Sequence, residues 1–394
     1  MQTVVLAAGE GTRMRPLTDR RPKPMLPVAD RPLVAHTMAA AVEAGASRFV
    51  LVVGYRREAV REYFGDEFRG VPVEYAVQDN QRGTADAVET AAEFLTPDPF
   101  VVLNGDALYD VESLSTLYDR TPAVGAVRVD DPTQYGVIEV QDGRVTAVVE
   151  KSDDPPTDLV NAGAYAFPAV AREYLNVEDS ERGERELTDV LERVCAVADV
   201  RAVSIDRWLD VGRPWELLAA NEWKLGELDR RVEGTVSEDA HLRDDVVVEA
   251  GARVDPGVVI EGPALVRAGA SVGPNAYVRG ATLVGPDASV GHSVEVKNAV
   301  LMRGATASHL SYVGDSILGR SVNFGAGTTV ANLRHDDEPV RLTVKGDRVS
   351  TGRRKFGVVC GDGVKTGIDA SLNAGVTLST DARVDPGETV TRDR

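Results

Sequence analysis

From Val236 onward an apolar side chain recurs at every sixth position, and glycine and proline gather between these positions. A second column, two places before the first, holds small or β-branched residues. A six-residue period of this length is typical of a parallel β-helix, in which inward side chains of successive coils stack into one core. The repeated positions are Val236, Leu242, Val248, Val254, Ile260, Val266, Val272, Val278, Val284, Val290, Val296 and Met302, followed after an interval by Leu372, Leu378, Val384 and Val390.

The pattern stops at Ser308, and His309 and Tyr312 follow closely in the stretch "SHLSYVGD". We expect residues 303–370 to interrupt a solenoid that resumes at Leu372. Inserted segments in repeat folds often carry the binding face. The interruption is therefore where this half of the chain should carry its chemistry.

Residues 1 to about 207 have a different organisation, in which short apolar runs alternate with segments of helical spacing. The runs "TVVLA", "FVLVV", "VEYAV" and "FVVLNGD" predict strands, and "RPLVAHTMAAAVEAG" and "TADAVETAAEFL" predict helices. For the first helix we expect Asp30 as N-cap, Pro32 in the opening turn and Gly45 past the end. This alternation predicts a parallel sheet with helices on both faces and ligands beyond the carboxyl ends of its strands.

The two patterns divide the chain into three parts. They predict a first domain over 1–213, one connecting helix over 214–231 that Pro214 opens, and a β-helix over 232–394. At 394 residues with 43% apolar composition, the chain can bury a core in each domain.

Composition excludes several classes of function. The net charge of −18 disfavours a nucleic-acid surface, and no apolar run reaches the roughly 18 residues of a membrane span, so we expect a cytoplasmic protein. Cys195 and Cys360 are isolated, which disfavours disulfides and cysteine zinc sites. Acidic residues outnumber basic ones 62 to 44, which suits a salt-adapted cytoplasm. A base-composition bias toward arginine codons is the alternative.

The first predicted strand leads into "LAAGEGTRMRPLTDRRPKP". This loop lacks the GK[ST] of a Walker A motif, and Met14 replaces the third glycine of a dinucleotide fingerprint. Gly9 and Gly11 would let backbone N–H groups approach a triphosphate, with Arg13 and Lys23 supplying positive charge. The alternative is a purely structural strand-to-helix turn.

The loop is one of several motifs that occur in a fixed order. With "PKPMLPV", "GTADAV", "VVLNGDAL", "YGVIEV", "VVEK", "NAGAYAF" and "WLDVGRPWELLAAN", it resembles the sugar-1-phosphate nucleotidylyltransferases over almost all of the first 225 residues. The resemblance implies an α/β Rossmann-like domain. It also implies attack by a sugar-1-phosphate oxygen on the α-phosphate of a nucleoside triphosphate around Mg²⁺, with pyrophosphate leaving.

The resemblance also implies a role for each matching position. Asp106 and Asp210 would bind Mg²⁺, and Arg13 and Lys23 would act on the triphosphate. The nucleotide would be held by Ala8, Gly9, Gly11, Gln78, Gly83 and Thr84, of which Gln78 and Gly83 read a uracil or thymine edge. The sugar phosphate would be held by Gly136, Glu150, Lys151 and Asn161.

The second half resembles an acetyltransferase. "VEVKNAVLMRGATASHLSYVGDS" and "VNFGAGTTVAN" resemble the left-handed β-helix of the bifunctional uridylyltransferase and glucosamine-1-phosphate acetyltransferase, in its archaeal-type version. The resemblance implies that His309 is the general base toward an amino sugar, with acetyl-CoA as co-substrate. The other residues implied are Arg279, Lys297 and Tyr312 on the sugar phosphate, Asn323 and Asn332 on the amine, and the backbone N–H of Ala326 on the oxyanion. It further implies a homotrimer.

One position departs from this family. Relatives commonly carry a lysine where this chain has Glu338, which places a negative charge near the expected coenzyme A phosphates. We expect compensation from the nearby cations Arg341, Lys345, Arg353, Arg354 and Lys355.

Two alternatives to the bifunctional enzyme remain open from the sequence. One is a glucose-1-phosphate uridylyl- or thymidylyltransferase whose β-helix is only structural or regulatory. The other is a non-catalytic assembly subunit of the kind found among translation-initiation exchange factors.

Overall fold

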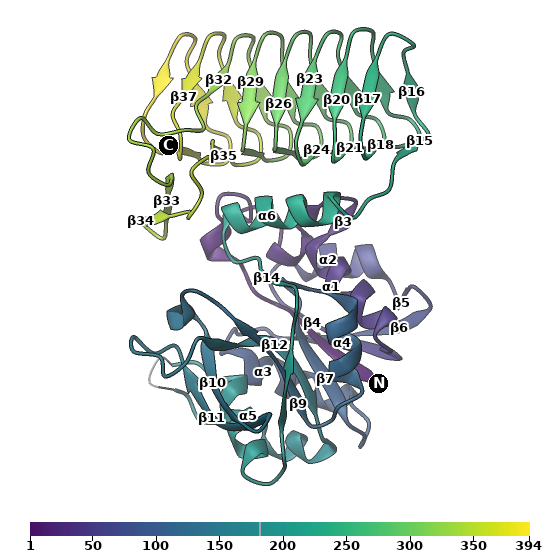
Figure 1. The fold of residues 1–394 in the computed structure, drawn as a ribbon, viewed down its shortest axis with the longest axis vertical. Helices are drawn as coiled ribbons and strands as arrows, with labels where there is room; N and C mark the ends of the chain where they lie inside the picture. Colours follow the sequence, from purple (N-terminus) through teal and green to yellow (C-terminus); the bar gives the residue numbers. More distant parts are fainter. Residues whose placement is uncertain (181–182) are drawn as a thin grey trace. The chain divides into compact units, whose positions relative to one another are not determined.

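The computed structural model describes residues 1–180 and 183–394 and divides them into two compact units. The first comprises Met1–Glu10, Pro22–Met25 and Pro32–Asp210, and the second comprises Gly11–Arg21, Leu26–Arg31 and Val211–Arg394. Figure 1 draws the first unit as a sheet layered with helices and the second as a stack of coils. In the described part of the chain, no helix is long and apolar enough to cross a membrane.

A ten-stranded sheet forms the centre of the first unit, in the order β10-β11-β13-β9-β12-β7-β1-β4-β6-β5. Its strands in that order are Gly136–Gln141, Arg144–Glu150, Arg201–Ser204, Ala123–Arg128, Leu159–Phe167, Phe100–Asn104, Gln2–Ala7, Arg48–Val53, Val71–Val77 and Glu67–Phe68. Strands β7, β1, β4 and β6 are parallel, as the alternation of strand and helix predicts.

The prediction of a parallel sheet holds for these central strands, and antiparallel pairs occur at both sides of them, between β12 and β7 and between β5 and β6. Strand β12 runs antiparallel to β7 and β9, and β10 and β11 form a hairpin. The two residues between them, Asp142 and Gly143, have φ of 52° and 76°. Such Asp-Gly pairs favour the tight turn that joins antiparallel strands, and this signal stands in the sequence stretch "QDGR".

Helices cover both faces of this sheet because its strands bury alternate side chains on opposite sides. Val5 and Val4 of β1, for example, belong to two different core clusters. The helices are α1 (Leu33–Glu43), α2 (Arg57–Phe64), α3 (Thr84–Ala91), α4 (Val111–Tyr118) and α5 (Leu187–Cys195). Helix α1 begins after Pro32 without a side-chain cap. Asp30 is therefore not its N-cap; its carboxylate instead accepts hydrogen bonds from Arg31 at 2.6 and 3.0 Å.

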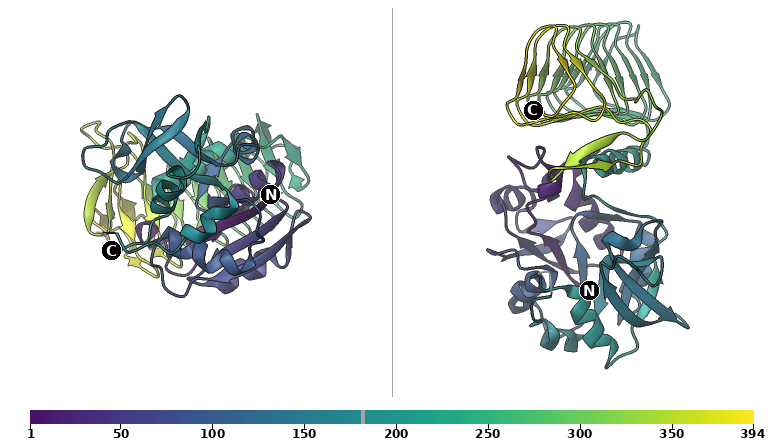
Figure 2. Two further views of the ribbon diagram at one scale, coloured as in Figure 1. Left: turned by 90° about the horizontal axis from the view of Figure 1, so that it is seen from below. Right: turned by 90° about the vertical axis from the view of Figure 1, so that its left-hand side faces the viewer.

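The second unit contains the β-helix, made of three sheets of eight parallel strands. Figure 2 shows the coils one behind another. Its first sheet holds β15 (Arg231–Val232), β18 (Val246–Val248), β21 (Ala264–Val266), β24 (Thr282–Val284), β27 (Val300–Leu301), β30 (Ile317–Leu318), β35 (Val359–Cys360) and β38 (Thr377–Leu378). The next holds β16 (Thr235–Val236), β19 (Arg253–Val254), β22 (Ser271–Val272), β25 (Ser289–Val290), β28 (Thr306–Ala307), β31 (Asn323–Phe324), β36 (Lys365–Thr366) and β39 (Arg383–Val384). The last holds β17 (His241–Arg243), β20 (Val259–Glu261), β23 (Tyr277–Arg279), β26 (Glu295–Lys297), β29 (Tyr312–Gly314), β32 (Thr329–Val330), β37 (Ser371–Leu372) and β40 (Thr389–Val390).

The six-residue count predicts that the repeat stops at Ser308, but the coils continue past this position. Val266 pairs with Val284 eighteen positions on, but Val284 pairs with Leu301, only seventeen positions on. The corner after Val296 is one residue shorter, so Leu301 takes the inward place predicted for Met302. The pattern therefore changes phase while the coil continues.

The true insertion is shorter than the expected interruption of 303–370. It lies between β32 and β35 and contains the hairpin of β33 (Arg341–Val344) and β34 (Asp347–Ser350). The solenoid resumes at Val359, which pairs with Ile317. His309 consequently lies at a corner of a regular coil. The connecting helix is also shorter than predicted, because α6 (Pro214–Leu225) ends before Gly226.

Candidate functional site

The loop after β1 leaves open space over its backbone. A side chain added at Gly9 would meet no atom within 4 Å, whereas the carbonyl of Ala8 accepts hydrogen bonds from the Tyr55 N–H and the Gln81 amide at 3.3 and 2.8 Å. The fixed carbonyl and the open glycine suit an approaching phosphate. Gly11 and Arg13 belong to the second unit, where Gly11 has φ of 71° and Arg13 lies against Gly212.

Lys23 and two carboxylates come together in the first unit. Lys23 is 6% exposed, and its ammonium lies 2.6 Å from Asp106 Oδ2. Asp106 immediately precedes β8 (Ala107–Tyr109), which pairs with β14 (Trp208–Asp210) so that Asp210 lies opposite Ala107. Burial raises the pKa of Tyr109, and the negative charges of Asp106 and Asp210 raise it further. Both predicted metal ligands, Asp106 and Asp210, therefore lie close to the Tyr109 phenol.

This pair of carboxylates fits Mg²⁺. The described residues hold no group of three or more His, Cys, Asp or Glu side chains that could bind a metal ion. Mg²⁺ is usually held by one or two carboxylates, retains water and takes its other ligands from substrate phosphates. A two-carboxylate site beside a lysine fits the ligand preferences of Mg²⁺ better than those of zinc or calcium.

The predicted sugar-phosphate residues come from three neighbouring strands. Gly136 on β10 pairs with Glu150 on β11, and Val137 pairs with Val160 on β12, which brings Asn161 alongside. A side chain at Gly136 would lie 2.6 Å from Glu150 Oε2, so the glycine makes room for that carboxylate. Lys151 follows at the strand end with 43% of its side chain exposed.

Asn161 is held in place by a β-bulge. The pairing of β12 with β9 shifts register between Asn161 and Tyr165. The Asn161 amide donates to Tyr165 Oη, and its oxygen accepts from the Gly163 N–H at 2.9 Å. Bulges re-aim side chains next to active sites. The structure therefore brings Gly136, Glu150 and Asn161 together; their roles toward a sugar stay predictions.

The predicted base-reading residues lie between β6 and α3. Gln78 follows β6 and is 6% exposed. Gly83 precedes α3 with φ of 121°, and Thr84 begins the helix, where its hydroxyl accepts from the Leu187 N–H at 2.9 Å. The structure brings all three residues together in one loop.

In the second unit, His309 lies at the corner between β28 and β29 and is exposed. No residue in the described part of the chain hydrogen-bonds to its imidazole. Its backbone carbonyl accepts from the Gly327 N–H at 2.9 Å, which places Ala326 on the adjacent coil. The Ala326 N–H donates to no acceptor among the described residues. Asn323 is exposed on β31 of that coil.

The predicted phosphate cations lie in one column of the third β-helix sheet. Arg279 pairs with Lys297 across β23 and β26. Each cation already has a carboxylate partner, Glu295 for Arg279 at 2.8 Å and Asp315 for Lys297 at 2.8 Å. The hydrogen bond to Glu295 raises the pKa of Arg279. A bound phosphate would therefore share these cations with protein carboxylates.

Asp315 was not predicted from the sequence. Its carboxylate is 4% exposed and accepts hydrogen bonds from Lys297 at 2.8 Å, Asn298 at 3.0 Å and Asn332 at 2.5 Å. Asn332 also donates to Tyr312 Oη at 3.2 Å. Burial raises the pKa of Tyr312, and the charge of Asp315 raises it further. One buried carboxylate thus positions three predicted substrate contacts: Lys297, Tyr312 and Asn332.

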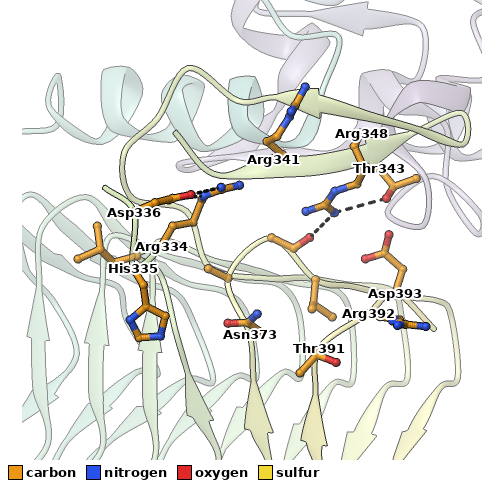
Figure 3. A pocket seen from close by; sticks show the side chains of 14 residues that line it. Arg334, His335, Asp336, Arg341, Thr343, Arg348, Asn373, Thr391, Arg392 and Asp393 are labelled. Carbon is orange, nitrogen blue, oxygen red and sulfur yellow. Dashed lines mark hydrogen bonds and ion pairs between the residues drawn. The ribbon is translucent and has the colours of Figure 1, made fainter. Parts of the chain in front are cut away.

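A pocket of about 530 Å³ opens where the inserted hairpin meets the last coils (Figure 3). Four arginines line it, together with two aspartates. Arg334 is paired with Asp336. Among the described residues, Arg348 donates only to uncharged acceptors, the Gly375 carbonyl at 3.2 Å and the Thr343 hydroxyl at 3.5 Å. Its charge therefore stays available to a ligand. The arginines are Arg334, Arg341, Arg348 and Arg392.

The cations expected to compensate for Glu338 are placed differently from one another. Arg341 lines the pocket, although Figure 3 draws its side chain rising from β33 away from the coils. Arg353 is paired with Glu222 of α6, and Arg354 with Asp337. The pocket arginines Arg334, Arg348 and Arg392 were therefore not predicted from the sequence. Two of the predicted cations, Arg353 and Arg354, are instead paired with carboxylates.

Comparison with known proteins places this arrangement in a family. The nucleotidyl transferase family model matches residues 2–225, and the GMPPB C-terminal domain model matches residues 260–380. Over the first part the fold is similar to a UDP-glucose pyrophosphorylase in complex with UDP-glucose, with a TM-score of 0.53 and 23% identity, covering 57% of this chain and 98% of that one.

Relatives that match along almost the whole chain include archaeal proteins. The bifunctional protein GlmU of Methanococcus vannielii is 40% identical over 97% of this chain and 93% of its own. A bifunctional sugar-1-phosphate nucleotidylyltransferase/acetyltransferase of Sulfurisphaera tokodaii is 35% identical over 100% of this chain and 98% of its own. The UTP–glucose-1-phosphate uridylyltransferase AglF of Haloferax volcanii is 38% identical but covers only 54% of this chain. Because relatives that are 40% and 35% identical match this chain over more than nine-tenths of both lengths, this chain belongs to the family of bifunctional GlmU-type sugar-1-phosphate nucleotidylyltransferase/acetyltransferases.

Proposed function

We propose that this protein acetylates an amino-sugar 1-phosphate and transfers a nucleotidyl group to the product, which gives a UDP- or dTDP-linked N-acetylhexosamine. The observation that carries the proposal is the presence of two separate polar sites, one in each compact unit. The first contains Lys23 and Asp106, and the second contains His309 and the Asp315 network. Full-length similarity to bifunctional relatives supports the pairing of the two activities.

In nucleotidyl transfer, an oxygen of the sugar 1-phosphate attacks the α-phosphorus of the nucleoside triphosphate. The new P–O bond forms as the bond to the β-phosphate breaks, and pyrophosphate leaves. We infer that Lys23 neutralises charge on the triphosphate, and that Glu150 and Asn161 orient the sugar. Positioning and charge neutralisation are the main contributions a protein makes to such a transfer. The role expected for Arg13 stays a prediction.

Mg²⁺ would be held by Asp106 and Asp210. When bound, it would supply positive charge to the phosphate oxygens. Asp106 lies 2.6 Å from the Lys23 ammonium, so the lysine also holds this carboxylate in place.

In acetyl transfer, the sugar amine attacks the thioester carbonyl of acetyl-CoA. The C–N bond forms, the C–S bond breaks, and coenzyme A leaves as the thiol. His309 would accept the amine proton, because its imidazole is exposed and has no hydrogen-bond partner among the described residues. The unpaired Ala326 N–H on the adjacent coil would donate to the developing oxyanion.

The arginine pocket is our candidate site for the phosphates of acetyl-CoA. It begins at Leu333, directly after Asn332, and continues past the ends of β37 and β40 in the same sheet as Lys297. Neighbouring strands lie about 4.8 Å apart, so β37 is roughly 14 Å from β26. A long, flexible acyl donor can span that distance.

The pocket assignment can be tested with two acyl donors. Arg348→Gln should raise the KM of acetyl-CoA about tenfold, the order expected for one charge-assisted contact to a phosphate. It should leave the KM of acetyl-pantetheine, which lacks the nucleotide, unchanged. The matched control is Arg303→Gln on a distant corner. Equal effects on both donors, or none, would contradict the assignment.

The two-site proposal is tested by separating the activities with single substitutions. Asp106→Asn removes a charge from the metal site and should lower nucleotidyl transfer by about a hundredfold or more while acetyl transfer continues. His309→Ala should lower acetyl transfer by about 10² to 10⁴. Nucleotidyl transfer to a pre-acetylated sugar phosphate should then stay at the wild-type rate.

Both rates are measured on both variants, with circular dichroism as the folding control. If His309→Ala retains full acetyl transfer, His309 is not the general base and the assignment of the second site is wrong. If the wild-type protein transfers no acetyl group, the β-helix is structural or regulatory and the single-activity alternative holds. Running the same two assays with each amino-sugar 1-phosphate and with each nucleotide shows whether glucosamine or galactosamine, and UTP or dTTP, is preferred. A homotrimer and a cytoplasmic location stay predictions.

A further inference from the structure

The Gln78 side chain has an orientation that its neighbours determine. Its Nε2 atom donates one hydrogen bond to Asp86 Oδ2 at 2.8 Å and another to the Gly83 carbonyl at 3.2 Å. Both partners are acceptors only, because one is a carboxylate and the other a backbone C=O. A flipped amide would place its oxygen against both of them. Asp86 therefore fixes which end of the amide faces outward.

The outward end is a lone acceptor. Among the described residues, none donates to Gln78 Oε1, and that atom is not among the buried unsatisfied ones. The N–H of Gly83 likewise donates to no described acceptor. One free acceptor and one free donor thus lie in the same loop.

This pair is complementary to an imide. Uracil and thymine present N3–H, a donor, next to a carbonyl, an acceptor. Cytosine and adenine present an unprotonated ring nitrogen at the corresponding edge, which would oppose Oε1 with another acceptor. We propose that Asp86 is a positioning residue that makes the nucleotide site select an imide pyrimidine and reject cytosine. This inference rests on the proposed nucleotidyl transfer and on the prediction that Gln78 contacts the base.

Asp86 is itself held firmly. It lies in the first turn of α3, and Arg185 lies 3.8 Å from its other oxygen. The Ala85 N–H donates to the Arg185 carbonyl at 2.9 Å, and a side chain at Gly83 would collide with the Arg185 backbone. The carboxylate therefore cannot turn away without disturbing the loop.

The test is the ratio of kcat/KM for UTP to that for CTP with one sugar 1-phosphate. In Asp86→Asn the new amide can donate or accept, so the closer of the two acceptors no longer opposes a flipped Gln78 amide, which can then meet cytosine. The ratio should fall by about tenfold to a hundredfold, the cost of one opposed hydrogen-bonding pair. Glu89→Gln is the matched control, because Glu89 lies on the same helix and contacts the same Arg185 at 3.3 Å. It should keep the wild-type ratio.

Two further measurements separate the possible failures. Wild-type protein should use dTTP but reject N3-methyl-UTP, which lacks the imide hydrogen; equal use of N3-methyl-UTP and UTP overturns the inference even if Asp86→Asn does not fold. Gln78→Ala should also lower the ratio. If Gln78→Ala lowers it and Asp86→Asn does not, Asp86 has no positioning role. If Gln78→Ala leaves it unchanged, Gln78 does not read the base, and that part of the proposed function fails.

Discussion

Asp315→Asn is the substitution whose effect the structure defines most closely. The carboxylate is 4% exposed and accepts from Lys297, Asn298 and Asn332. The Asp315 backbone has φ of 49°, a left-handed conformation that Asn tolerates and most residues do not. The change therefore keeps the volume and the turn and replaces only one oxygen by an NH₂ group.

The magnitude follows from the three donors. Lys297 and Asn332 share one carboxylate oxygen, so the new carbonyl should turn toward them and leave the NH₂ facing Asn298. One unsatisfied buried donor costs about 1–3 kcal/mol. Removing one partner of a buried ion pair costs about 3–5 kcal/mol. In Asp315→Asn the Lys297 side chain keeps its 17% exposure and one uncharged acceptor. We therefore expect a loss of stability at the lower end of these ranges, about 3 kcal/mol in total.

Hydrogen exchange of the full chain measures this loss locally. A drop of about 3 kcal/mol in opening free energy speeds amide exchange roughly a hundredfold. The increase should appear in peptides covering 294–332, while peptides of β7 serve as the internal control. Asp287→Asn is the matched variant, since Asp287 also has positive φ, 59°, but its side chain is 59% exposed. If both variants exchange alike, the buried network does not stabilise these coils and the reasoning is refuted.

Three other outcomes are expected. UTP or dTTP should be turned over much faster than GTP or ATP, because Gln78 is expected to pair with a pyrimidine edge; highest turnover with GTP would make that assignment wrong. The melting temperature should rise from dilute to molar KCl, because acidic residues outnumber basic ones 62 to 44 and salt screens their repulsion; a salt-independent melting temperature would contradict this. Burial raises the pKa of Cys195 to about 11 and also raises the pKa of Cys360. At pH 8 a disulfide reagent should therefore titrate less than one thiol per native chain and two after unfolding, which also gives the coenzyme A release assay a low background.

The sequence by itself determined the two architectures and most of the candidate site. Hydrophobic period is a local property, so the six-residue repeat identified the β-helix and the short apolar runs identified β1, β4, β6 and β7. The motifs also located Gly136, Glu150 and Asn161, which the structure then placed on three neighbouring strands. Strand positions that are distant along the chain could be grouped only through the resemblance.

Only the tertiary structure decided register, orientation and partnership. A corner shortened by one residue moved the inward position from Met302 to Leu301, and counting along the sequence cannot distinguish that shift from an insertion. "GTADAV" and "YVGD" contain Asp86 and Asp315, but their importance depends on what each carboxylate faces. Asp86 fixes the amide of Gln78, and Asp315 gathers donors from the coils on either side of its own. Such contacts arise from the stacking of coils and the packing of loops, which no local pattern records.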